Sequence, residues 1–62
     1  MMLTKKTLTA INKYGLDTCL IAFRRSEEGD GARTIGFEYG LKTNQADAAI
    51  NAGREYESKK QG

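Results

Sequence analysis

The sequence predicts a small all-α domain that contains a helix-turn-helix at about residues 32–53. Gly40 separates two stretches in which apolar residues recur at the spacing of an α-helix. Small Gly36 lies one turn before Gly40, where it would let two helices approach closely. Short polar residues follow the glycine, as on the outer face of a recognition helix. We expect residues 1–62 to form one domain, because a chain of this length supports a single modest core.

Composition excludes several classes of protein. The chain has one cysteine and no histidine, so we expect no internal disulfide, no zinc finger and no other metal or cofactor. No apolar run approaches the ~20 residues of a membrane span, and no secretory signal pattern opens the chain. We therefore expect a cytoplasmic protein. The net charge of +2 favours a nucleic-acid partner only slightly.

The first helix is expected to begin with Thr4 or Thr7 as its N-cap and to end at Gly15. Its apolar residues follow roughly one face of a 3.6-residue period. These residues are Leu3, Leu8, Ile11 and Tyr14.

A second helix is expected from Asp17, as its N-cap, to Ser26, with Gly29 as the stop signal. The inner side chains would be those of Cys19, Leu20 and Phe23. Cys19 is interpreted as a small buried hydrophobic residue, because no histidine is present to activate it.

The third helix is expected over Ala32–Tyr39, with Ile35 and Tyr39 turned inward. Gly40 would adopt the left-handed conformation of the turn, and Leu41 would fill the corner. The last helix is expected to start with Thr43 as its N-cap. Its inner stripe would consist of Ala46, Ala49, Ile50, Gly53, and Tyr56 or Glu57.

An alternative is an α+β helix–hairpin–helix fold. Residues 18–23 form a short apolar run, residues 28–31 could make a hairpin turn, and residues 34–39 alternate between apolar and polar. Gly36 would interrupt the second strand without any gain, whereas the helix-turn-helix gives it a packing role. The all-α interpretation is therefore preferred.

Outward residues after the turn are suited to reading base edges in a major groove. Asparagine and glutamine can bond adenine through two hydrogen bonds, lysine can reach guanine or a phosphate, and aspartate can accept from cytosine. The predicted base contacts are Lys42, Thr43, Asn44, Gln45, Asp47 and Asn51. The predicted backbone contacts are Arg33, Thr34 and Arg54. The alternative is that these residues form an ordinary solvated surface.

Catalysis is not expected, because no carboxylate pair, phosphate-binding glycine loop or nucleophile–base arrangement stands out. The acidic residues Glu27, Glu28 and Asp30 are interpreted as a solvated turn between glycines. The aromatic residues Tyr14, Phe23, Phe37 and Tyr39 are interpreted as core or near-core residues.

The segment from Asp30 to Asn51 resembles the helix-turn-helix of small plasmid and phage repressors, and is similar to plasmid global repressors of the TrfB/KorA kind. The resemblance rests on a polar loop, a helix, and the turn Gly40-Leu41-Lys42-Thr43 that opens the next helix. Two features depart from that pattern. Ala46 replaces the usual branched residue, and no separate dimerisation segment is evident.

The resemblance implies a sequence-specific regulator, encoded by a mobile element, that binds double-stranded DNA and acts as a dimer. We expect a repressor that occludes a promoter or operator. The alternative function belongs to a different class: a small phage or plasmid protein that binds a host or virion protein, as an inhibitor or assembly factor.

Overall fold

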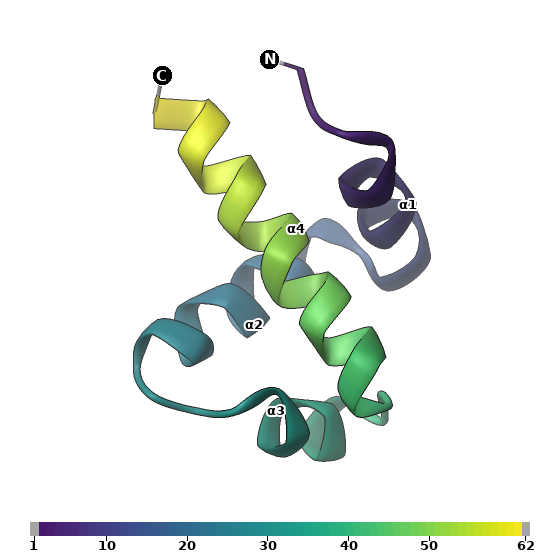
Figure 1. The fold of residues 1–62 in the computed structure, drawn as a ribbon, viewed down its shortest axis with the longest axis vertical. Coiled ribbons are helices and arrows are strands. Elements are labelled where there is room, and N and C mark those ends of the chain that lie inside the picture. Colours follow the sequence, from purple (N-terminus) through teal and green to yellow (C-terminus); the bar gives the residue numbers. More distant parts are fainter. Residues whose placement is uncertain (1, 62) are drawn as a thin grey trace.

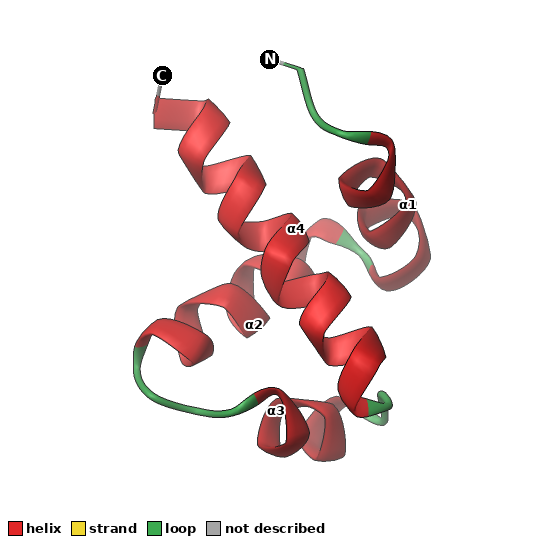
Figure 2. Ribbon diagram, in the orientation of Figure 1, coloured by secondary structure: helices red, strands yellow, loops and turns green. Residues whose placement is uncertain are grey.

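The computed structural model describes residues 2–61, which form four α-helices and, within that range, no strand (Figures 1 and 2). The helices are α1 (Lys5–Tyr14), α2 (Leu16–Glu27), α3 (Ala32–Tyr39) and α4 (Thr43–Gln61). The predicted all-α fold is confirmed, and the hairpin alternative is wrong. None of the described helices is both long and apolar enough to cross a membrane.

Helix α4 runs through the centre of the molecule and packs against each of the other three helices (Figure 1). The body measures 30 × 22 × 15 Å along its principal axes. A helix of 19 residues is about 28 Å long, so α4 alone spans almost the whole long dimension.

Local capping decides where α1 ends and α2 begins. The Thr4 hydroxyl accepts a hydrogen bond from the Thr7 N–H at 3.3 Å, which confirms Thr4 as the N-cap of α1. Gly15 has a φ of 89° and ends α1 by donating its N–H to the Ile11 carbonyl. The same glycine is the N-cap of α2, so the prediction of Asp17 as N-cap is wrong. Asp17 lies in the first turn, where its negative charge interacts favourably with the positive end of the helix dipole.

The core consists mainly of small side chains. Its buried residues are Ala10, Cys19, Ala22, Ile35, Ala46, Ala49, Ile50 and Ala52. Small side chains let helix axes approach closely. At the buried Gly53, the backbone of α4 comes into contact with the backbone of α2. A Cβ at Gly53 would overlap the Cys19 carbonyl group and would lie 2.8 Å from Phe23 Cβ. The α2–α4 contact therefore depends on glycine for space.

Several large apolar residues that were predicted to be inside lie at the surface. Leu8 is 53% exposed and Phe37 is 90% exposed, so both predictions are wrong. In α1 the inward face consists of Thr7 and Ala10, with Ile11 and Tyr14 beside them. Leu8 lies on the other side of the helix because successive residues are about 100° apart.

The loop between α2 and α3 is held by one arginine. Arg25 Nε donates to Asp30 Oδ2 at 2.9 Å, and Arg25 Nη2 donates to Glu38 Oε1 at 3.0 Å. The hydrogen bond with Asp30 raises the pKa of Arg25. Because these groups are partly exposed, the pairs add little to stability, and the pair with Glu38 connects α2 to α3.

Candidate nucleic-acid interface

The predicted turn between α3 and α4 is present. Gly40 has φ 69° and ψ 27°, which is the left-handed conformation, and the Leu41 N–H donates to the Gly36 carbonyl at 2.7 Å. A Cβ at Gly36 would lie 2.6 Å from the Leu41 carbonyl oxygen. Gly36 therefore has the packing role predicted from the sequence. Ile35 and Ala46 are fully buried where the two helices meet.

Helix α4 begins one residue earlier than predicted, because Thr43 is its first helical residue and not its N-cap. The Lys42 carbonyl accepts the N–H of Ala46 at 2.9 Å, which makes Lys42 the N-cap instead of Thr43. The Gln45 side chain explains the shift, because its Oε1 accepts the Lys42 N–H at 2.9 Å. This contact is half of a capping box. Thr43 lies exposed in the first turn.

A polar row extends along the outer face of α4. Asn44, Asp47, Ala48 and Asn51 are all exposed and follow the i, i+3, i+4, i+7 spacing of one helix face. We call these four residues the polar row. Three of them are predicted base contacts, and the fold brings them together on a surface that nothing in the described chain covers.

Gln45 differs from the polar row in position and in bonding. It is half-buried, and its carbonyl oxygen is engaged by the Lys42 N–H. Of the two atoms needed to bond adenine in bidentate fashion, only the amide nitrogen stays free. The structure thus assigns Gln45 a capping role, whereas the sequence predicted a base contact.

Arg54 lies one turn beyond the polar row and continues the same face of α4. Its Nη1 donates to Asn51 Oδ1 at 2.9 Å, and its guanidinium lies 5.8 Å from the centroid of the Phe23 ring. The cation is therefore positioned by two neighbours, at the end of the face remote from the turn.

The other predicted backbone contacts gather beside the turn. Arg33 and Thr34 of α3 are exposed and line an open depression of about 560 Å³ together with Lys42 and Thr43. Phe37 lines the same depression, which the sequence did not predict. The amphipathic spacing of α3 contains the missing signal, because Phe37 is about 200° from Ile35 around the helix.

A further depression, of about 260 Å³, lies between α1 and the polar row. Lys6 and Thr7 of α1 line it with Asn44, Asp47 and Asn51. The sequence offered no signal for this arrangement, because α1 and α4 are far apart along the chain.

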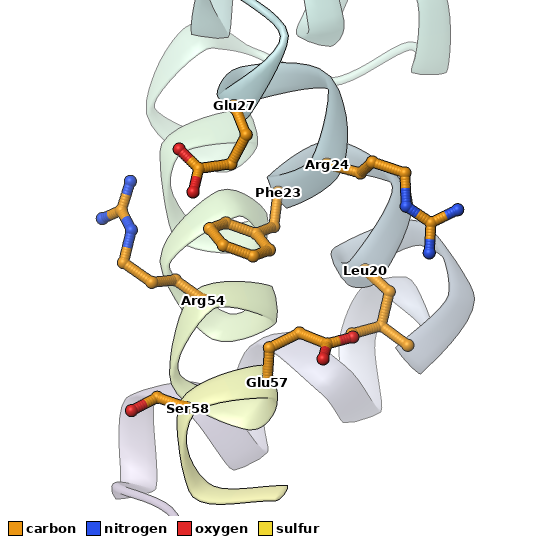
Figure 3. Close-up of a pocket in the computed structure, with 7 residues that line it drawn as sticks. All are labelled: Leu20, Phe23, Arg24, Glu27, Arg54, Glu57 and Ser58. Atoms are coloured by element: carbon orange, nitrogen blue, oxygen red, sulfur yellow. The ribbon is translucent and has the colours of Figure 1, made fainter. Parts of the chain in front are cut away.

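A groove of about 580 Å³, lined in part by Arg54, lies between α2 and the C-terminal part of α4 (Figure 3). The Phe23 ring lies between Glu27 of α2 and Arg54 of α4 (Figure 3). Leu20, Arg24, Glu57 and Ser58 complete its lining. The groove is lined by two arginines, two glutamates and the apolar side chains of Leu20 and Phe23. These lining residues form no nucleophile–base arrangement.

Two other groups have shifted proton affinities. Burial raises the pKa of the Cys19 thiol, so the buried side chain stays protonated at neutral pH. The backbone hydrogen bond from Thr4 lowers the pKa of Glu55. Among the described residues, no three His, Cys, Asp or Glu side chains form a group that could hold a metal ion.

Comparison with known proteins identifies no relative: no family, no curated protein and no solved structure matches this chain.

Proposed function

We propose that this protein is a sequence-specific DNA-binding regulator, a repressor encoded by a phage or plasmid. The observation that supports this most is the polar row on α4, which begins within one turn of a tight two-helix corner. In such units the second helix enters the major groove and the first helix crosses the backbone. Here α4 would be the recognition helix and α3 the helix before it.

In this proposal the residues have separate tasks. The amide of Asn44 contacts adenine, and Asp47 accepts from the N4 amino group of cytosine. Asn51, whose Oδ1 already accepts from Arg54, contacts a base through its amide nitrogen. Ala48 presents its methyl group, which suits contact with the methyl group of thymine. Lys42 and Thr43 contact bases or phosphates at the edge of the groove. Arg33, Thr34 and Arg54 contact phosphates and set the orientation on the duplex.

The proposed mechanism is occlusion. A repressor bound across a promoter or operator prevents polymerase from engaging it, and no catalytic step or cofactor is involved. A single α4 reads only a few base pairs, so we propose a homodimer on two half-sites about one helical turn apart. The site of action would be the cytoplasm, where the one cysteine stays reduced.

The test is selection of bound sequences from random duplex DNA, followed by titration at several salt concentrations. We expect one short, palindromic site to be enriched, and affinity to fall steeply as salt rises. Asn44→Ala should weaken binding to that site by ~1–3 kcal/mol and leave random DNA almost unaffected. Arg33→Ala should weaken both duplexes equally and reduce the salt slope.

A protein partner is the second candidate, and the exposure of Phe37 favours it. The Phe37 side chain is 90% exposed and lines the depression beside the turn together with Leu41, which gives a protein partner apolar surface to bury. In this case α3, and not α4, would be the binding element. Retention of one host or phage protein by the wild type but not by Phe37→Ala, with no duplex retained at low salt, would favour this function over DNA binding.

A further inference from the structure

Three lysines of α1 lie along the border of the polar row. Lys5, Lys6 and Lys13 line an open depression of about 590 Å³ that includes Ala48 of α4. Lys6 also lines the smaller depression shared with Asn44, Asp47 and Asn51. Helix α1 therefore brings the side chains of three lysines, which we call the lysine row, to the edge of the surface that α4 presents.

These lysines are not used to hold the fold together. All three are exposed, and no ion pair within residues 2–61 includes them. The Lys13 ammonium lies 5.6 Å from the centroid of the neighbouring Tyr14 ring. Arg25 is the opposite case, because its charge is matched by Asp30 and Glu38.

Two of the lysines occupy positions that helix electrostatics disfavours. Lys5 and Lys6 are the first residues of α1, next to the positive end of the helix dipole. The helix contains no acidic residue to offset them. Glu55 of α4 lies at this end of the helix, where its Oε1 accepts the Thr4 N–H, but it forms no ion pair with either lysine. Lys5 and Lys6 are therefore exposed cations without an ion-pair partner among residues 2–61, which suits an external anion.

We propose that Lys5, Lys6 and Lys13 form a second phosphate-binding row for duplex DNA. This inference rests on the proposed function. In Figure 1, α3 crosses the beginning of α4, whereas α1 lies beside its middle. Cations therefore lie near the polar row in two places. Arg33 and Lys42 line the depression at the turn with Thr43, the residue before Asn44, and Lys5, Lys6 and Lys13 line the depression along α1 that includes Ala48. A major groove is likewise bordered by phosphates of two strands.

Lysine ammonium groups bind phosphate oxygens as point charges, without reading sequence. The lysine row should therefore add affinity for any duplex and should not alter which site is preferred. Each phosphate neutralised releases counterions, so each contact contributes about 0.9 to the slope of log affinity against log salt concentration.

The experiment compares two double variants that remove the same charge. Lys6→Ala/Lys13→Ala removes two members of the lysine row. Lys59→Ala/Lys60→Ala removes two exposed lysines near the C-terminal end of α4, and is the matched control. Fluorescence anisotropy of a labelled duplex is measured between about 50 and 200 mM salt, for the selected site and for random DNA.

We expect the first variant to lower the salt slope by about 1.8 and to weaken both duplexes by the same factor, whereas the control keeps the slope close to that of the wild type. If the wild type binds DNA and the two variants have equal salt slopes, the proposal for the lysine row is overturned, whereas the proposed DNA-binding function stands. If the first variant loses its preference for the selected site, the lysines contact bases, and the proposal that they contact phosphates is overturned. A wild type that binds no duplex overturns the proposed function as well.

Folding is checked by circular dichroism, and Lys6→Gln/Lys13→Gln is a second variant that keeps most of the side-chain length. It should show the same reduced slope as the alanine variant, because the effect depends on charge. A wild-type slope in the folded glutamine variant would contradict the proposal.

Discussion

Gly53 of α4 lies directly against the backbone carbonyl group of Cys19 in α2, so that even one methyl group at residue 53 would overlap it. This contact joins the two helices at backbone level, and it places Phe23 beside Arg54. The position of the polar row relative to α2 therefore depends on the absence of a side chain at residue 53.

Gly53→Ala should destabilise the protein by about 1–3 kcal/mol in urea unfolding, because α2 and α4 must move apart. Helix propensity alone predicts the reverse, since alanine is favoured over glycine by about 1 kcal/mol inside a helix. The sign of the change thus separates the two effects. Ser58→Ala, an exposed change on the same helix, should stay within about 0.5 kcal/mol. A more stable Gly53→Ala protein would show that the close approach is absent.

Gly40 should tolerate asparagine far better than valine. Its φ of 69° is left-handed, a conformation that asparagine adopts readily and a β-branched residue does not. Gly40→Val should cost more than the ~1 kcal/mol of an ordinary helical glycine change, and Gly40→Asn should cost less. Thermal unfolding followed by circular dichroism measures both. Equal stability of the two variants would mean that residue 40 has no left-handed requirement.

Asn44→Ala and Gln45→Ala should differ in what they change. Gln45 caps α4 through the Lys42 N–H, so its loss should lower the free energy of unfolding by about 0.5–1.5 kcal/mol. Asn44 is exposed on the polar row, so its loss should leave stability within about 0.5 kcal/mol and should reduce affinity for the selected site. Urea unfolding and DNA titration of both variants test this division. An unchanged stability of Gln45→Ala would contradict the capping role.

Stability should fall in acid partly because of Glu55. Its Oε1 accepts the Thr4 N–H at 2.6 Å, and this hydrogen bond lowers its pKa in the folded protein. The stabilisation is complete above the ordinary glutamate pKa of about 4.3 and is lost as pH falls through the lower, folded value. Glu55→Gln removes this titration, so its melting temperature should fall less than that of the wild type between about pH 6 and pH 3.

Glu55→Asp is the companion variant, because it keeps the charge but shortens the reach to Thr4 by one methylene. It should behave like Glu55→Gln if the hydrogen bond causes the acid dependence. A wild-type profile for Glu55→Asp would assign the dependence to charge alone.

Local signals in the sequence were sufficient to predict the four helices and the turn at Gly40 between α3 and α4. Thr4 caps α1 through its own hydroxyl, and Gly40 supplies a conformation that few other residues adopt. Both effects act within one turn of the chain, so they can be recognised without knowledge of the fold. Helix α3 accordingly has the predicted bounds, Ala32–Tyr39. The one-residue error at the start of α4 arose because the Gln45 side chain, predicted as a base contact, accepts the Lys42 N–H, and Lys42 is the N-cap in place of Thr43.

Tertiary packing alone decided which side chains are inside and which cations meet the polar row. Ala22 and Ala52 are buried, whereas Phe37 is exposed on the side of α3 away from the buried Ile35. Alanine occurs equally well on a surface, so its burial has no local signal. Lys6 lies beside Asn44 because α1 packs across α4. The sequence by itself determined the helix-turn-helix, and the packing of α1 and α2 on α4 decided its surroundings, because those contacts join residues far apart in the chain.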